Sequence, residues 1–391
     1  MMELQFKDLE FKKLESGRTR ISFLKQFYFD LDADESRDVF IKDKNKIEYN
    51  GKERQLRLLI SSKIETELYC SFTGRRAVYV HQPPLIGIQR FGILDSGTNC
   101  VEIRPITGCN LNCIYCSVKE GPEKKNAVDF VVDKDLIVRE FKLIAENKKD
   151  VYVYISGQGE PLFYSKIVEL VSDLAKLEQV KHISINTNGT LLSRELIDSL
   201  AEAGLTRFNL SLNAISKELS SKIAGIGKGI STISVASYAV EHIMKMARYI
   251  RKKGLDLVIA PIYLQGINDK EIGRIIEFAK ETGAFVGIQN FLSYAGGRKP
   301  VKQLDSSEFE SCLKELEKTH KLKLLNPDTG IKIEKQKTLA KPFKRGQTIL
   351  VEKRYPGIGE CSGRLVSIPL NDKKQFKVKL VRDKHNVFAG M

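Results

Sequence analysis

The chain contains 391 residues with a mass of 44.2 kDa, enough for two or three domains of about 100 to 200 residues each. Apolar residues make up 42% and charged residues 29%, which excludes a disordered, collagen-like or disulfide-scaffold chain. No apolar run approaches the roughly 20 residues of a membrane-spanning helix, and the start lacks a signal-peptide pattern. We therefore expect a soluble, cytoplasmic protein without a membrane span, whose net charge of +15 favours polyanionic partners.

Residues 1–95 are expected to form an N-terminal accessory domain. Charged stretches alternate there with β-prone ones at 20–31, 55–60 and 69–82, and the region ends near the turn Gln82-Pro83-Pro84. The pattern predicts a small α+β or β-rich domain.

Residues 96–325 show short apolar runs that alternate with amphipathic segments of helical length. The predicted strands are 101–106, 151–155, 182–186, 207–212, 255–262 and 284–289. The predicted helices are 133–147, 164–177, 193–203, 233–252 and 269–282. Six strands with five intervening helices predict an α/β fold, a partial (βα)6 TIM-like barrel, whose active site gathers at the carboxyl ends of the strands.

Residues 331–391 change pattern again, with predicted short strands at 348–351, 363–369 and 376–381 between turn-forming residues. Three to five short strands in about 60 residues predict a small, OB-like β-barrel. This stretch holds 15 Lys and Arg against 5 acidic residues, so it carries +10 of the net +15.

Three of the seven cysteines, Cys109, Cys113 and Cys116, follow the first predicted barrel strand in a C-x3-C-x2-C spacing. Three thiolates on one loop suit three corners of a [4Fe-4S] cube, which leaves the fourth iron open to a small molecule. The alternative is a zinc site, but zinc prefers four ligands. Neither a second cysteine pair nor a nearby histidine accompanies the triplet, since the next histidine is His182.

This spacing, together with the barrel that follows, resembles the radical S-adenosylmethionine (SAM) superfamily. The resemblance implies that a reduced cluster binds SAM and cleaves it to methionine and a 5′-deoxyadenosyl radical, which abstracts hydrogen from a substrate. It also implies a low-potential electron donor such as ferredoxin or flavodoxin.

The segment Gly157-Gln158-Gly159-Glu160-Pro161 after the second predicted strand is similar to the family's GGEP-type motif, although it reads GQGEP. The resemblance implies that it contacts the methionyl ammonium of SAM. Glycine permits close approach of the backbone to a ligand, and a carboxylate opposite an ammonium makes a charge-assisted contact. A plain strand-to-helix turn is the alternative reading.

Asn186-Thr187-Asn188-Gly189 matches the TNG turn of the family, and Ser211 and Asn213 stand two apart, so both point to one face of a strand. Tyr115 stands where family members often carry an aromatic against adenine. Capping of strand ends and core packing are the alternatives for these residues. The expected SAM contacts are Tyr115, Gly157, Gln158, Gly159, Glu160, Asn188, Ser211, Asn213 and Gln289.

The other cysteines, Cys70, Cys100, Cys312 and Cys361, are read either as small buried residues or as catalytic groups or ligands of a second cluster. Methylthiotransferases of the superfamily carry three further N-terminal cysteines, whereas only Cys70 and Cys100 precede this triplet. Methylthiolation is therefore disfavoured. No catalytic side chain is identified.

The basic C-terminal stretch resembles a TRAM domain, a small oligonucleotide-binding barrel attached to several RNA-modifying enzymes, through segments such as 341–352 and 357–364. Its charge and its interleaved Phe343, Tyr355 and Phe376 favour an RNA surface over a merely solvated basic face. The expected RNA contacts are Lys341, Lys344, Arg345, Lys353, Arg354, Arg364, Lys377 and Lys379.

The leading hypothesis is a radical SAM enzyme, an RNA-modifying transferase that acts on a splayed-out nucleotide, with tRNA as the first expectation. The alternative is a biosynthetic radical SAM enzyme acting on a small metabolite, peptide or lipid. A third hypothesis, a non-enzymatic iron-sulfur protein that binds RNA, predicts no SAM cleavage.

Overall fold

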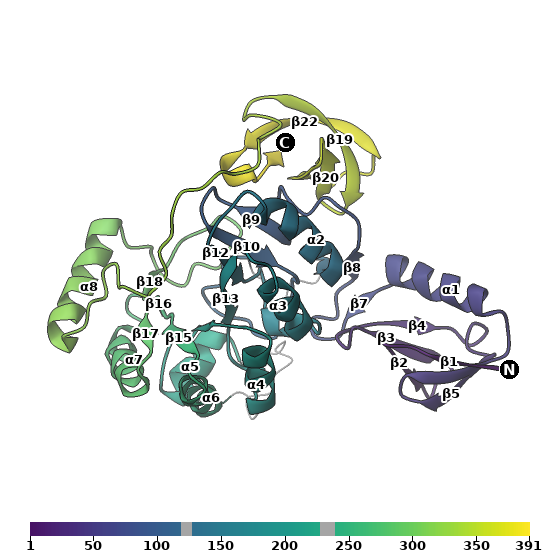
Figure 1. Ribbon diagram of the computed structural model, residues 1–391, viewed down its shortest axis with the longest axis horizontal. Helices are drawn as coiled ribbons and strands as arrows, with labels where there is room; N and C mark the ends of the chain where they lie inside the picture. The colour runs from purple at the N-terminus through teal and green to yellow at the C-terminus, as the bar shows by residue number, and fades with distance from the viewer. Residues whose placement is uncertain (119–126, 227–238) are drawn as a thin grey trace.

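The computed structural model describes residues 1–118, 127–226 and 239–391, and the chain folds into three parts (Figure 1). An N-terminal β-rich part lies at one end of the long axis, a central α/β part follows, and a small C-terminal barrel packs beside the central sheet. Among the described residues, no helix is long and apolar enough to cross a membrane.

The N-terminal part contains two antiparallel sheets and one helix, in agreement with the predicted α+β or β-rich domain. One sheet has the order β1-β6-β5, and the other β2-β3-β4-β7. Their strands are β1 (Met2–Gln5), β2 (Leu9–Lys13), β3 (Thr19–Phe23), β4 (Phe27–Leu31), β5 (Val39–Asp43), β6 (Lys46–Tyr49) and β7 (Tyr69–Cys70).

The β-prone reading of residues 55–60 is wrong, because they lie inside helix α1 (Glu53–Thr66). Leu56 and Ile60, four residues apart, are the buried positions of this helix. That spacing follows one face of a helix and does not match the two-residue period of a strand.

The central sheet has seven strands in the order β17-β15-β14-β13-β12-β10-β9. All neighbours are parallel except β9, which runs antiparallel to β10. The strands are β9 (Gly92–Asp95), β10 (Cys100–Arg104), β12 (Val151–Ile155), β13 (Val180–Thr187), β14 (Arg207–Leu210), β15 (Asp256–Ile259) and β17 (Phe285–Val286). The predicted partial (βα)6 barrel is thus confirmed.

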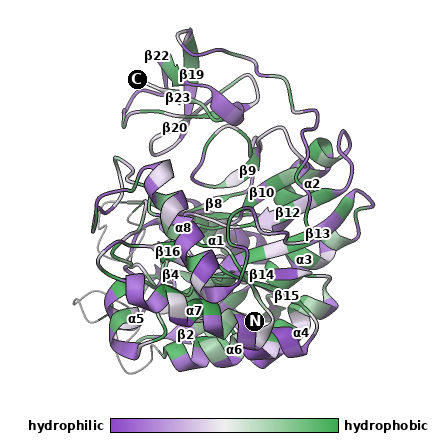
Figure 2. Ribbon diagram, turned by 90° about the vertical axis from the view of Figure 1, so that its left-hand side faces the viewer, coloured by the Kyte–Doolittle hydropathy of each residue, from purple (hydrophilic) through white to green (hydrophobic). Residues whose placement is uncertain are grey.

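Helices follow the strands as crossovers, and in Figure 2 they carry both hydrophobic and hydrophilic stretches, as amphipathic helices over a sheet should. Their bounds are α2 (Lys134–Ala145), α3 (Ile167–Ala175), α4 (Arg194–Glu202), α5 (Lys217–Ala224), α6 (Val240–Lys252), α7 (Asp269–Thr282) and α8 (Ser306–His320). Helices α5 and α8 were not predicted. Part of the predicted helix 233–252 lies outside the described residues.

Two predicted strands are interrupted in the structure. The stretch 255–262 divides into β15 and β16 (Ile262–Tyr263), and 284–289 divides into β17 and β18 (Gln289–Asn290), which pairs with β16. Pro261 lies at the first interruption and has no N–H to donate to a neighbouring strand. One more parallel pair, β8 (Ala77–Val80) with β11 (Asp129–Val132), joins the segment before β9 to the segment after the cysteines.

A connecting segment, residues 329–338, runs along the amino-terminal edge of the central sheet, and we call it the strap. Asn99, beside the start of β10, donates its Nδ2 to the carbonyl of Lys332 (2.9 Å), and its Oδ1 accepts from the N–H of Glu334 (2.8 Å). Arg207, at the start of β14, donates to the carbonyl of Thr329. The strap therefore covers the base of the barrel.

The predicted C-terminal barrel is confirmed as a closed barrel in the order β19-β20-β21-β23-β22. Its strands are β19 (Thr348–Tyr355), β20 (Ile358–Cys361), β21 (Arg364–Ser367), β22 (Gln375–Arg382) and β23 (Ala389–Gly390). It docks through backbone hydrogen bonds from Leu365 to Ile86 (2.8 Å) and from Phe388 to Gly87 (2.7 Å). Gly87 is required there, because a Cβ would lie 2.0 Å from the carbonyl oxygen of Leu365.

Candidate cluster and cofactor site

The loop that carries the cysteine triplet crosses the GQGEP loop at the carboxyl ends of β10 and β12. Gly108 and Gly159 form a bridge, and the N–H of Glu160 donates to the carbonyl of Gly108 at 2.9 Å. A Cβ on Gly159 would lie 2.0 Å from that oxygen, and one on Gly157 would lie 3.1 Å from the carbonyl oxygen of Ile106. In the structure, these glycines therefore allow two loops to touch, a role that the motif alone did not indicate.

Helix α5 holds the same loop from a second side. The N–H groups of Asn112 and Ile114 donate to the last carbonyls of α5, at Ala224 (3.0 Å) and Ile223 (2.9 Å). Gly225 ends the helix in the left-handed conformation (φ +70°), and a Cβ there would lie 2.0 Å from the carbonyl oxygen of Asn112. The C-terminus of this helix thus fixes the backbone between Cys109 and Cys116.

Arg298 braces the loop from a third side, and sequence reasoning missed it. Its Nη1 donates to the carbonyl of Cys113 at 2.6 Å, its Nη2 donates to Oδ1 of Asn112, and its backbone N–H donates to the carbonyl of Cys116 at 2.9 Å. No local motif surrounds Arg298 in the sequence. A contact between positions this far apart therefore could not be predicted from the sequence.

The three thiols are half-buried and close enough to influence one another. Burial raises the pKa of Cys113 to about 12, with a further contribution from Cys116, and burial also raises the pKa of Cys109. Without a cation the thiols of Cys109 and Cys113 therefore stay protonated, and bound iron would shift them to thiolates.

A single-ion site does not fit the donors. In the described part of the chain, no three His, Cys, Asp or Glu side chains lie close enough to hold one metal ion. In a [4Fe-4S] cube each cysteine binds a different iron, so the sulfurs need not converge on one point. The donor set therefore suits a cluster better than zinc.

Glu160 is buried and accepts three hydrogen bonds. Its Oε1 accepts from the N–H of Leu162 (3.0 Å) and the hydroxyl of Thr187 (2.7 Å), and its Oε2 accepts from the N–H of Asn188 (2.7 Å). Burial raises the pKa of Glu160 to about 7, against the lowering effect of these donors. The carboxylate thus ties the GQGEP loop to the TNG turn, and Oε2, with one donor in the structure, has a lone pair left for another.

Asn188 connects the TNG turn to the cysteine loop. Its Nδ2 lies 3.8 Å from Sγ of Cys109 and donates to Oδ1 of Asn110 at 3.0 Å. Asn110 in turn donates to the hydroxyl of Thr190 at 2.8 Å. The first three strand ends of the barrel are therefore joined at the cysteines.

Tyr115 and Asn213 meet, because Nδ2 of Asn213 donates to Oη of Tyr115 at 2.8 Å. Oδ1 of Asn213 accepts from the N–H of Ile262 at 2.8 Å, and the Tyr115 ring packs against a small apolar cluster. Asn213 thus links the cysteine loop to the fourth and fifth strands of the barrel.

The expected pairing of Ser211 with Asn213 on one strand face is wrong. Strand β14 ends at Leu210, and the N–H of Leu212 donates to the carbonyl of Leu210, so the chain turns there and strand alternation no longer applies. Gln289 is exposed on β18. No side-chain hydrogen bond of Gln158, Ser211 or Gln289 is found within the described residues.

The other four cysteines stand on separate elements. Cys70 is buried in β7, whereas the half-buried Cys100, Cys312 and Cys361 belong to β10, α8 and β20. Within residues 1–118, 127–226 and 239–391, no second group of three ligands forms that could hold a metal ion.

The aromatic residues of the C-terminal barrel take part in its packing and docking. Phe343 is buried against Phe388, Phe376 packs against the same barrel core, and Tyr355 contacts Phe91 and Phe130 of the central part. The expected base-stacking role is therefore wrong for the buried Phe343, whereas the half-buried Tyr355 and Phe376 keep part of each ring exposed and their stacking role stays a prediction.

The basic side chains differ in availability. Arg354 pairs with Glu360 (2.5 Å), Arg364 donates to the carbonyl of Ala340 (3.1 Å), and Lys341 lies 4.0 Å from Asp383. Lys344 and Arg345 are exposed in a turn, and Lys353 is half-buried. Lys377 and Lys379 are exposed on β22 opposite Leu350 and Thr348, so they share one outer face with the exposed Leu350.

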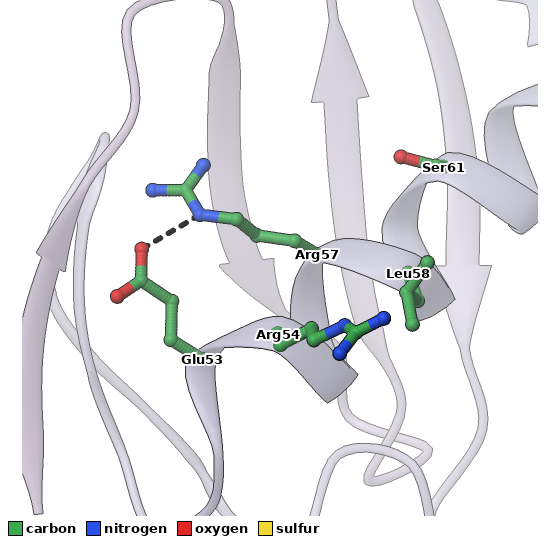
Figure 3. Close-up of a pocket in the computed structure, with 5 residues that line it drawn as sticks. All are labelled: Glu53, Arg54, Arg57, Leu58 and Ser61. Atoms are coloured by element: carbon green, nitrogen blue, oxygen red, sulfur yellow. Dashed lines mark hydrogen bonds and ion pairs between the residues drawn. The ribbon is translucent and has the colours of Figure 1, made fainter.

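Two surface hollows lie away from the cysteine loop. One, of about 490 Å³, is lined by Glu53, Arg54, Arg57, Leu58 and Ser61 of α1, where Glu53 pairs with Arg57 at 2.7 Å (Figure 3). The other, of about 590 Å³, lies among α6, α7 and α8 beside the His320–Glu277 pair. Neither includes a predicted cofactor residue.

Comparison with known proteins agrees with this geometry. Residues 103–279 match the Radical SAM superfamily. An uncharacterized protein of Methanocaldococcus jannaschii is 33% identical over 373 residues, which cover 85% of this chain and 84% of that protein. The relationship thus extends well beyond the barrel.

Partial matches involve nucleotide cyclases. A probable GTP 3′,8-cyclase of M. jannaschii is 32% identical over 191 residues (47% of this chain), and the GTP 3′,8-cyclase of Listeria welshimeri is 30% identical over 222 residues (54% of this chain). The chain spans 56% and 60% of their lengths. Among solved structures, Streptococcus suis SuiB is 15% identical with a TM-score of 0.44, over 81% of this chain and 68% of SuiB.

Proposed function

Because the chain belongs to the radical SAM superfamily, whose enzymes use a [4Fe-4S] cluster and SAM, we propose that Cys109, Cys113 and Cys116 hold that cluster. The main support for the proposal is that three separate elements hold the cysteine loop by hydrogen bonds: the GQGEP loop, the end of α5 and Arg298. When bound, the cluster and SAM supply a 5′-deoxyadenosyl radical for hydrogen abstraction. The protein contributes fixed sulfur positions, so that little ordering remains when iron binds.

The residues around the triplet are proposed to orient SAM. The spare acceptor capacity of Glu160 Oε2 suits the methionyl ammonium. The GQGEP backbone (Gly157, Gln158, Gly159), Asn188, Ser211 and the Tyr115–Asn213 pair are the proposed remaining contacts, with Gln289 toward the substrate side. Electrons would come from a low-potential donor of the ferredoxin or flavodoxin class.

The proposed substrate is a small molecule that enters the barrel. The strap closes the base of the sheet, so the open end is the one that carries the cysteines. The cyclases that match half of this chain are named for action on GTP, which supports a small polar substrate over a polymer.

Anaerobic reconstitution with iron and sulfide tests the proposal. We expect about four irons per chain and formation of 5′-deoxyadenosine from SAM under reduction. Cys109→Ser, Cys113→Ser and Cys116→Ser should each abolish both, whereas Cys361→Ser, on the C-terminal barrel, should retain both. Zinc in place of iron, or SAM cleavage that survives loss of a triplet cysteine, contradicts it.

A second candidate, modification of RNA and first of tRNA by a TRAM-like tail, is favoured by the outer face with Lys377, Lys379 and Leu350. Lys344 and Arg345 extend the positive charge of the same barrel. This candidate predicts tRNA binding that weakens steeply with salt. The double variant Lys377→Glu/Lys379→Glu should abolish binding, and Lys318→Glu on α8 should not. Equal binding by both variants would rule out this surface.

A further inference from the structure

The two faces of the central sheet differ sharply in chemistry. Residues that alternate along the strands bury apolar side chains toward the helices: Val101, Val153, Ile183, Phe208 and Leu257 are at most 1% exposed. The intervening positions include Tyr152, His182, Arg207 and the apolar Val258, and beside them stand Glu102, Tyr154, Ser184, Asn186 and Asn209. We call the last five residues the inner face. An inward face of a packed barrel is usually filled with branched apolar residues, so this polar set requires an explanation.

Strand register places the inner-face residues in rows. Glu102 pairs with Tyr154 and Tyr154 with Ser184, which forms one row across β10, β12 and β13. Asn186 pairs with Asn209 in the next row toward the carboxyl ends. Asn188, whose Nδ2 lies 3.8 Å from Sγ of Cys109, follows Asn186 by two residues, just past the end of β13. The inner face therefore ends close to the loop that carries Cys109.

The charged groups of this region are already paired. Arg104 donates to Oε1 of Glu102 at 2.8 Å, and Arg207 pairs with Asp256 at 2.9 Å. Ser184 is also engaged, with the hydroxyl of Tyr152 at 2.5 Å and Nδ2 of Asn209 at 3.4 Å. Among the described strand residues, both arginines on this side of the sheet are thus already engaged by a carboxylate.

Two polar groups of the inner face lack a hydrogen-bond partner among the described residues. The hydroxyl of Tyr154 and the side-chain amide of Asn186 make no hydrogen bond to any described residue, although both side chains are half-buried. Neither group is among the described side-chain atoms that are fully buried without a partner, so both remain accessible to water or to a ligand. A phenol hydroxyl and an amide can each donate and accept, so they complement a ligand edge that does the same.

We infer, resting on the function proposed above, that the inner face binds the substrate and that the bound part is an uncharged nitrogen heterocycle of the nucleobase type. Asn186 would pair with the hydrogen-bonding edge of the ring, as Asn does with adenine, and the Tyr154 ring offers apolar contact beside it. Any phosphates of the substrate lie outside this face.

Equilibrium dialysis with reconstituted enzyme tests the inference, with SAM present in excess so that its own adenosine site is filled. The probes are guanosine, cytidine and uridine. We expect at least one to bind saturably, Asn186→Ala and Tyr154→Phe each to weaken it roughly tenfold, and Asn147→Ala, at an exposed position after α2, to leave it unchanged. GTP should bind no more than about tenfold tighter than guanosine.

The inference is overturned if no probe binds, if neither variant alters binding, or if GTP binds more than a hundredfold tighter than guanosine. 5′-Deoxyadenosine formation, measured in the same preparations, separates the two claims. If the protein cleaves SAM normally but binds no nucleoside, the inferred substrate class is wrong and the proposed function stands. If the wild-type protein fails to cleave SAM, the proposed function itself is wrong.

Discussion

Nη1 of Arg298 lies 2.6 Å from the carbonyl oxygen of Cys113, a residue that precedes it by 185 positions. The same guanidinium reaches Asn112, and the backbone of Arg298 reaches Cys116. Through its side chain and its backbone together, Arg298 thus contacts the stretch that carries two of the three proposed iron ligands. Gly297 permits this approach, because a Cβ there would lie 2.9 Å from the carbonyl oxygen of Ser117.

Replacement of Arg298 by alanine should loosen the cysteine loop. Each lost hydrogen bond from the charged group costs about 1.5–3 kcal/mol, so we expect cluster loading after reconstitution to fall several-fold. Arg298→Lys keeps the positive charge but loses the pair of guanidinium N–H donors, so we expect cluster loading between that of wild type and that of the alanine variant. Iron content and the visible absorbance of the cluster measure the effect. Lys299→Ala is the control, and equal loading of Arg298→Ala and Lys299→Ala would show that the brace is dispensable.

Gly159→Ala should be far more harmful than Gly157→Ala. The added methyl would lie 2.0 Å from the backbone oxygen of Gly108 in the first case and 3.1 Å from that of Ile106 in the second. Backbone cannot swing aside as a flexible side chain does, so the first substitution must separate the two loops. We expect a loss of roughly 3 kcal/mol or more for Gly159→Ala and about 1 kcal/mol for Gly157→Ala in denaturant unfolding. Similar losses would mean that the loops do not meet as described.

The parts that sequence revealed are those whose pattern is local. Alternating apolar runs located the barrel strands, and the cysteine spacing, GQGEP and TNG each occupy one short stretch at a strand end. Arg298, the C-terminus of α5 and the strap act through contacts between distant positions, which a single sequence does not display. The aromatic residues of the C-terminal barrel show a second limit of prediction from sequence. Composition shows that Phe343 and Tyr355 are present, but it does not show which side of the barrel each ring faces.

Glu160 should make stability depend on pH. Its pKa rises from 4.5 to about 7 on folding because of burial, so the native protein holds the proton more tightly than the unfolded chain. The free energy of unfolding should therefore fall as pH rises from about 4.5 to about 7 and then level off. Glu160→Gln removes this contribution. Urea unfolding of SAM-free protein at pH 5, 6, 7 and 8 measures it, and parallel pH profiles for wild type and variant would contradict it.

Lys148 and Lys149 form a matched pair for testing the strap. The Lys148 ammonium is fully buried, lies 3.0 Å from the Asp95 carboxylate, and donates to the carbonyls of Thr98 (2.8 Å) and Lys337 (3.0 Å), whereas Lys149 is exposed. Lys148→Met leaves Asp95 charged without its buried partner, so we expect a loss of about 3–5 kcal/mol and faster proteolysis within 329–338. Lys149→Met should change stability by no more than about 0.5 kcal/mol.

The double variant Lys148→Met/Asp95→Asn removes the unpaired buried charge and should recover part of the loss. If instead it is as unstable as Lys148→Met alone, the hydrogen bonds to the strap, and not the ion pair, hold the base of the barrel closed.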